Sequence, residues 1–162
     1  MGEDQPGVAF ALTGPIGKVV ASTRPQFRWK PLKDADSYVV KIFDAKFRSV
    51  AESPPLRSTV WVPPVQLSHG NAYQWQVTAI KDGEEVVSPV RPAPDARFRV
   101  VDAAAANDIA AAKRARSHLV LGITYANAGL IDEAEREFGK LLERNPRSEV
   151  VKGLLRKVRA AR

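Results

Sequence analysis

The chain changes its residue pattern near Asp102, and this change limits the folds that are open to it. Eleven of the 12 prolines lie before this point, where polar and apolar residues alternate with the two-residue period of β-strands. After it only Pro146 remains, and Ala, Leu, Glu, Lys and Arg dominate, which is the composition of helices. The sequence therefore predicts a multidomain β + α chain, with a β-domain over 1–101 and a helical region over 102–162.

Short strands at close spacing fill the β-domain. Residues 72–80 give the clearest alternation, with aromatic and aliphatic side chains on one face and glutamines on the other. Several such strands, separated by turn signals about every 8 to 12 residues, are typical of an antiparallel β-sandwich. The expected core comprises Trp29, Tyr38, Tyr73, Trp75 and Val77.

Two segments of the β-domain carry motifs with a defined spacing. Trp29 precedes the run Ala-Asp-Ser-Tyr at 35–38, and residues 67–73 read Leu-Ser-His-Gly-Asn-Ala-Tyr. Over about residues 6–101 these motifs resemble a fibronectin type III domain, whose tyrosine corner has the Leu-x-x-Gly-x-x-Tyr spacing. The resemblance implies that the Tyr73 hydroxyl bonds to backbone upstream. It does not select a function, because this sandwich serves as spacer, adhesion and ligand module alike.

Start and stop signals divide the helical region. Asp102 is a good N-cap, and no proline or glycine pair interrupts the residues that follow, so one helix is expected over about 103–127. Gly129 is placed for a left-handed C-terminal cap. Two further helices are expected over 131–144, closed by a proline, and over 148–161, opened by a serine.

Small and aromatic residues recur after residue 115 at the spacing of one tetratricopeptide repeat. They are Leu121, Gly122, Tyr125, Gly129, Ala134, Phe138, Leu141 and Pro146. Residues 115–148 therefore resemble one such repeat (TPR), a helical hairpin that is followed here by a capping C-terminal helix. The resemblance implies that Gly122 and Ala134 face each other where the paired helices approach most closely.

The first helix of a tetratricopeptide repeat lines a groove that holds peptides, and the resemblance maps this groove onto four residues. The candidate partner-groove residues are Arg116, Leu119, Ile123 and Asn127. Burial of the same residues against another part of the chain is an equally open interpretation. Because a lone repeat cannot bury its apolar surfaces, we expect the sandwich, a second copy of the chain or a partner peptide to cover this side.

The net charge of +7 is concentrated toward the C-terminus. Residues 144–162 hold seven basic residues and only one acidic residue, Glu149. The favoured interpretation is a solvated helix whose cations complement the negative end of its dipole. The alternative is nucleic-acid or anionic-surface binding through this helix, although nucleic acid is not the expected partner.

Residue types that carry catalysis or bind metals are scarce. The chain has no cysteine and two histidines, His69 and His118. His69 lies in the turn of the tyrosine-corner motif, and His118 lies where the repeat often has an aromatic residue, so both have structural explanations. We therefore expect no enzyme, no catalytic residue, no metal site and no cofactor.

The tryptophans and tyrosines of the β-domain raise the question of a stacking surface. Their period favours the core, and Trp61 is the candidate exposed aromatic because Val60 and Val62 compete with it for the interior. A carbohydrate-associated module is a further alternative that depends on the tryptophans alone.

These observations favour a non-catalytic protein–protein interaction or scaffold module. The acidic start lacks the hydrophobic segment of a signal peptide, and no apolar run approaches the roughly 18 residues of a membrane span. We expect the soluble part of a larger bacterial protein with a protein or peptide partner, and a homo-oligomer is also open. Such modules suggest the extracytoplasmic (periplasmic) portion of a membrane-anchored protein, with the membrane reached only through an anchor in the parent chain.

Overall fold

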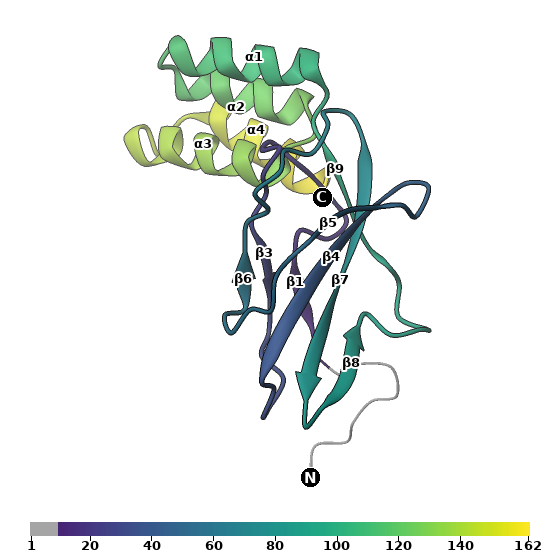
Figure 1. The fold of residues 1–162 in the computed structure, drawn as a ribbon. Coiled ribbons are helices and arrows are strands. Elements are labelled where there is room, and N and C mark those ends of the chain that lie inside the picture. The colour runs from purple at the N-terminus through teal and green to yellow at the C-terminus, as the bar shows by residue number, and fades with distance from the viewer. Residues whose placement is uncertain (1–9) are drawn as a thin grey trace. The chain divides into compact units, whose positions relative to one another are not determined.

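The computed structural model describes residues 10–162, which form two compact units (Figure 1). The first unit ends at Val100 and the second begins at Val101. Strands make up the first unit and helices the second. The acidic start of the chain, and residues 6–9 of the stretch that resembles a fibronectin domain, lie outside the described residues.

The first unit is a β-sandwich of two sheets. One sheet has three strands in the order β1-β3-β6, and the other has the order β2-β9-β7-β4-β5, with β8 also paired to β7. The strands are β1 (Leu12–Gly14), β2 (Lys18–Val20), β3 (Phe27–Trp29), β4 (Ser37–Asp44), β5 (Ser49–Glu52), β6 (Val60–Trp61), β7 (Ala72–Lys81), β8 (Glu84–Ser88) and β9 (Ala96–Val100).

One strand pair departs from the expected antiparallel arrangement. β2 runs parallel to β9, with Lys18 opposite Phe98. The reason is that the chain changes sheets between β1 and β2: β1 pairs with β3, while the Gly17 N–H donates to the Arg97 carbonyl at 2.6 Å and starts the pairing with β9. This contact joins segments far apart in the sequence, so local alternation does not predict it.

The expected core is confirmed. Trp29, Tyr38, Tyr73, Trp75 and Val77 all have relative exposures of 5% or less. The Tyr73 hydroxyl accepts a hydrogen bond from the Ser68 N–H at 2.8 Å, as the tyrosine-corner motif predicts. The Trp75 Nε1 donates to the Pro15 carbonyl at 2.8 Å, so this large side chain is buried with its polar group satisfied.

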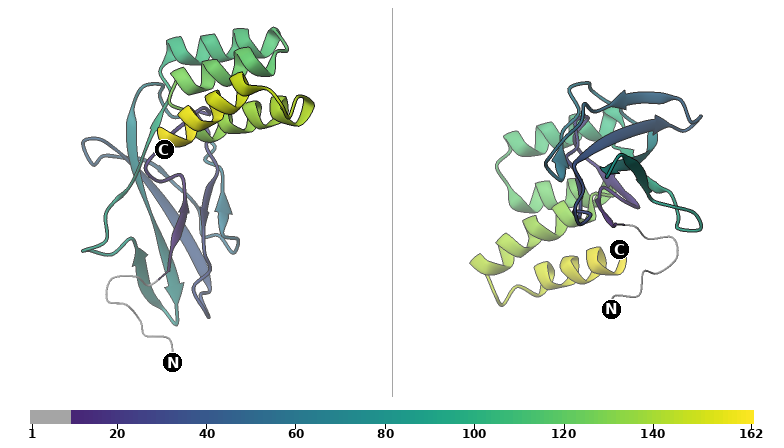
Figure 2. Two further views of the ribbon diagram at one scale, coloured as in Figure 1. Left: turned by 180° about the vertical axis from the view of Figure 1, so that it is seen from behind. Right: turned by 60° about the horizontal axis from the view of Figure 1, so that its bottom comes forward.

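The second unit contains four helices within the described residues, and each packs against the next along the chain (Figure 2). They are α1 (Ala103–Arg114), α2 (His118–Asn127), α3 (Ile131–Arg144) and α4 (Glu149–Ala160). Asp102 and Ser148 cap α1 and α4 through their side chains, and Gly129 has the expected positive φ of 80°.

The expected single helix over 103–127 is wrong, because the chain bends after α1. Arg116 adopts a left-handed φ of 51°, a conformation that cannot continue a right-handed helix. The Ser117 hydroxyl then accepts a hydrogen bond from the Val120 N–H at 3.2 Å, which caps a new helix. As a result α1 and α2 form a hairpin of their own.

The close approach between α2 and α3 occurs at Gly122. A Cβ at this position would lie 2.5 to 3.0 Å from three ring carbons of Phe138, which is 1% exposed. Ala134 is fully buried on α3, but the three atoms nearest to Gly122 all belong to Phe138. The expected pairing of Gly122 with Ala134 stays a prediction, and the structure adds Phe138, one helical turn along α3 from Ala134, as a direct neighbour of Gly122.

Candidate functional site

An open groove of about 590 Å³ runs between α1 and α2. Its α1 wall consists mainly of alanines, and its α2 wall includes Val120, Thr124 and Asn127. These three positions recur every three or four residues and therefore lie on one face of α2. The α1 residues and helix-flanking positions that complete the lining are Asp102, Ala104, Ala105, Asp108, Ala111, Ala112, Ala115 and Ala128. Small side chains along one wall leave room for another chain to approach closely.

Two carboxylates give this groove a negative character. The Asp102 carboxylate already has a partner within the chain, because it accepts a hydrogen bond from the Ala105 N–H at 2.7 Å. Asp108 is exposed, and within residues 10–162 it has no hydrogen bond or ion pair from its side chain. The Asp108 carboxylate is therefore available to a cation from outside the chain.

Apolar side chains on α2 continue the groove onto the surface. Leu119, Val120 and Ile123 are 39%, 44% and 40% exposed. A contiguous exposed apolar patch of this kind marks interaction surfaces when it is rimmed by polar residues. Helix α2 thus exposes three aliphatic side chains to solvent on neighbouring positions.

The four candidate partner-groove residues occupy different places. Asn127 lines the groove, and Leu119 and Ile123 are exposed beside it. Arg116 lies in the bend between α1 and α2 instead. Sequence reasoning missed Val120 and Thr124, because the resemblance to the repeat mapped the groove onto the neighbouring positions Leu119 and Ile123.

Both histidines lie at positions that the fold explains. His118 Nδ1 lies 2.5 Å from a carboxylate oxygen of Glu137 on α3, and Glu137 also pairs with Lys140 at 3.4 Å. These contacts give the buried Glu137 carboxylate its partners. Nearby, burial and the charges of Glu137 and Glu133 raise the pKa of Tyr125. His69 is an exposed residue of the β6–β7 loop, as the tyrosine-corner motif implies.

The exposed aromatic of the sandwich is not Trp61. Trp61 is only 9% exposed and packs its ring 6.1 Å from that of Phe27, because Val62 rather than Trp61 points to solvent, with 42% exposure. The expectation for Trp61 is therefore wrong. Phe47, between β4 and β5, is 65% exposed, and sequence reasoning did not single it out.

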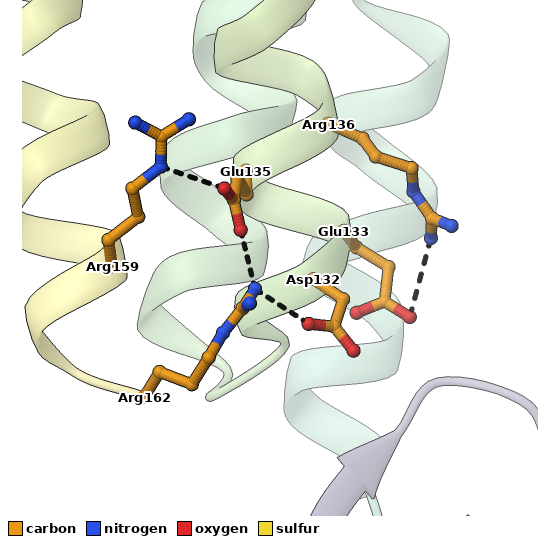
Figure 3. A network of polar contacts seen from close by, with 6 residues as sticks. All are labelled: Asp132, Glu133, Glu135, Arg136, Arg159 and Arg162. Carbon is orange, nitrogen blue, oxygen red and sulfur yellow. Dashed lines mark hydrogen bonds and ion pairs between the residues drawn. The ribbon is translucent and has the colours of Figure 1, made fainter. Parts of the chain in front are cut away.

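Ion pairs tie the basic C-terminal helix to α3 (Figure 3). Arg159 donates to Glu135 at 2.8 Å, and Arg162 contacts both Asp132 and Glu135. The hydrogen bond from Arg159 lowers the pKa of Glu135, and the charge of Arg162 acts in the same direction. Part of the positive charge of this segment is thus already paired within the helical unit.

Residues 10–162 show neither a metal-binding cluster nor a membrane-spanning helix. No group of three or more His, Asp or Glu side chains there is arranged to hold a metal ion. In the same part of the chain, no helix has both the length and the apolar character that a membrane crossing requires.

Comparisons with known proteins give the following. No protein family model and no curated protein matches the sequence. Among solved structures, the chain is similar to CopC from Methylosinus trichosporium OB3b, with 17% identity and a TM-score of 0.40, over 58% of this chain and 95% of that one. It is also similar to a fourth FNIII domain of human origin, with 20% identity and a TM-score of 0.38, over 61% of this chain and 82% of that one.

Proposed function

We propose that this chain is a non-catalytic protein–protein interaction module whose contact surface is the groove between α1 and α2. The observation that carries the proposal is the apolar face of α2, where Leu119, Val120 and Ile123 lie exposed beside an open groove. Leaving this apolar surface in water opposes the hydrophobic effect, whereas covering it with a partner is favourable.

The finer fold assignment belongs to the same proposal. The helical hairpin of α2 and α3 is taken as one tetratricopeptide-like repeat with α4 as its cap, supported by Gly122 packed on Phe138 and by the left-handed Gly129. The sandwich is taken as fibronectin type III-like, supported by the bond of the Tyr73 hydroxyl to backbone. In this proposal the sandwich supports or spaces the helical unit.

The groove chemistry suggests what the partner peptide carries. The alanines of α1 allow a close backbone approach, and the apolar face of α2 favours aliphatic or aromatic side chains. The free carboxylate of Asp108 favours a Lys or Arg of the peptide. We therefore propose a peptide with apolar anchors and at least one basic residue.

A selection from a random peptide library on the wild-type chain tests this proposal. We expect enriched peptides with a basic residue among apolar anchors, whose binding is lost in Val120→Glu. The matched control is Val150→Glu on α4, because Val150 is 71% exposed and lies outside the groove lining. Peptides that bind Val120→Glu as well as wild type would overturn the proposal.

Self-association is the competing way to cover the same surface. Sedimentation measurements over a range of concentrations separate the two, since a dimer through α2 would dissociate in Leu119→Glu/Ile123→Glu. A monomeric wild type that binds selected peptides supports the peptide groove. A wild-type dimer that excludes peptides would replace that proposal with a homo-oligomer.

The nucleic-acid alternative is less favoured than the peptide groove. Arg159 and Arg162 already pair with acidic residues of α3, which leaves fewer cations of the C-terminal helix for phosphates. Nucleic-acid binding would fall steeply with salt, so a salt titration with an oligonucleotide distinguishes it.

A further inference from the structure

The hairpin that joins β4 to β5 ends in an exposed aromatic residue with a strained backbone. Phe47 has a φ of 62° and is 65% exposed. Left-handed conformations suit Gly, Asn and Asp, and a bulky residue there is an outlier. Asp34 and Asp82 are tolerated in this conformation for that reason, but Phe47 gains neither burial nor a local hydrogen bond from its side chain. A retained outlier of this kind is a motive to look for function.

The Asp44 carboxylate holds this hairpin tip in one conformation. One of its oxygens accepts hydrogen bonds from the N–H groups of Lys46 and Arg48, at 2.8 and 3.0 Å. The other oxygen accepts from the Arg48 Nε at 3.0 Å. The Phe47 N–H donates to the Asp44 carbonyl at 3.0 Å, which closes the turn. The tip is therefore preorganised, and the Phe47 ring is presented to solvent without a large entropy cost on binding.

Two further loops share the same end of the sandwich. The Leu67 N–H donates to the Thr23 carbonyl at 2.8 Å and so joins the β6–β7 loop to the β2–β3 loop. Asp44, at the end of β4, lies opposite Tyr73, at the start of β7, which brings the hairpin tip to this end as well. We call residues 21–26, 45–48 and 62–71 together the cationic end.

Cations outnumber acids at the cationic end. Its three loops contain Arg24, Lys46 and Arg48 and no Asp or Glu. The adjacent Asp44 pairs with Arg48 at 3.0 Å, so within residues 10–162 Arg24 and Lys46 are the loop cations without an acidic partner. By contrast, the β3–β4 loop over 30–36, at the other end of the sandwich, contains two lysines and two aspartates. Arg99 adds a further cation where its guanidinium donates to the Gly70 carbonyl.

Exposed apolar side chains accompany these cations. Besides Phe47, the β6–β7 loop presents Val62 and Val65, which are 42% and 46% exposed. Apolar residues that project from a surface rich in Lys and Arg are the combination that binds an anionic bilayer, since the apolar groups enter the interface while the cations meet the headgroups.

We propose that the cationic end of the sandwich binds an anionic membrane surface, with Phe47 as its inserted anchor. The anchors are separate and lie on different loops, which suits a wide surface better than a single pocket of a protein partner. The sequence led us to expect contact with a membrane only through an anchor in the parent chain. The contact proposed here is a different one, made by the sandwich itself. It is independent of the groove between α1 and α2.

Co-sedimentation with vesicles tests the proposal directly. With vesicles of equal parts phosphatidylcholine and phosphatidylglycerol, we expect the full chain to bind, and with phosphatidylcholine alone we expect little binding. Phe47→Asn should weaken binding about tenfold, the effect of about 1.4 kcal/mol, because it removes the anchor. Since Asn tolerates a positive φ, the melting temperature should stay unchanged or rise.

Control variants separate this surface from other cationic and apolar sites. Lys46→Gln, which leaves Phe47 in place, should weaken binding about fivefold. Val90→Asn on the β8–β9 loop and Lys157→Gln on α4 should leave it unchanged.

Three results would overturn the proposal. The first is equal vesicle binding by wild type and Phe47→Asn. The second is loss of vesicle binding in Lys157→Gln while Lys46→Gln binds like wild type. The third is Phe47-dependent binding to soluble polyglutamate without binding to vesicles. The last result would indicate an acidic protein instead.

Discussion

Replacing Gly122 by alanine is expected to destabilise the helical unit, although alanine is the better helix former. In a helix interior alanine gains about 0.8–1.0 kcal/mol over glycine. A Cβ at Gly122 would lie 2.5 Å from a ring carbon of Phe138, and Phe138 is 1% exposed, so its ring has little space into which to move. Overpacking costs about 1–3 kcal/mol, and so close an approach belongs at the upper end. The expected net loss is about 1–2 kcal/mol.

Gly139→Ala on α3 is the matched control. Apart from its chain neighbours and the backbone of its own helix, no atom lies within 4 Å of a Cβ at Gly139, so alanine there should stabilise the helix by about 1 kcal/mol. Urea unfolding followed by far-UV circular dichroism reports on the helices. Tryptophan fluorescence reports separately on the sandwich, because all three tryptophans lie in the first unit.

The two variants should therefore change the free energy of unfolding in opposite directions, while the fluorescence transition stays the same. Equal stabilisation by Gly122→Ala and Gly139→Ala would refute the reasoning. It would mean that α2 and α3 do not approach closely at Gly122, and the proposed tetratricopeptide-like assignment of this hairpin would lose its packing basis.

Three further outcomes are expected. Trp75→Phe should cost about 1–2 kcal/mol more than Trp29→Phe in thermal unfolding, because the Trp75 Nε1 donates to a backbone carbonyl, whereas the buried Trp29 Nε1 has no partner among residues 10–162. Arg116→Gly should stabilise the helical unit by up to about 1 kcal/mol in urea unfolding, because glycine adopts the φ of 51° at this position without the strain of a side chain. The hydrogen bond from Arg159 lowers the pKa of Glu135. The stabilisation of the helical unit by this pair is therefore present above the ordinary pKa of Glu and is lost as the pH falls through the lowered pKa. Arg159→Gln should make the free energy of unfolding of the helices less dependent on acid pH.

Features that depend on a few neighbouring residues could be predicted from the sequence. Asp102 and Ser148 cap helices where expected, because an N-cap side chain bonds to backbone only three residues away. The tyrosine corner is similarly local, since Ser68 and Tyr73 are five residues apart. The core of the sandwich followed from the two-residue period of β7, whose alternate side chains are buried.

Features that depend on distant contacts or on exceptions to local preference could not be predicted. The bend at Arg116 breaks an alanine-rich run that contains no proline, and the capping side chain of Ser117 is the local residue that indicates it. The groove residues expected from the repeat resemblance include Asn127, which lines the groove, whereas the neighbouring Val120 and Thr124 appear only in the structure. Phe47 occupies a conformation that the sequence would assign to Gly or Asn, so its exposure appears only in the structure.

The central claim is that peptides bind in the groove between α1 and α2, and amide chemical-shift mapping tests it most directly. The wild-type chain would be titrated with a peptide enriched on it, and the shifts of assigned backbone amides followed. We expect the largest changes at Val120, Thr124 and Asn127 and along the alanine wall of α1, with none of comparable size on the sandwich. Changes confined to α4 or to the sandwich, with the α1 and α2 amides unmoved, would contradict the claim.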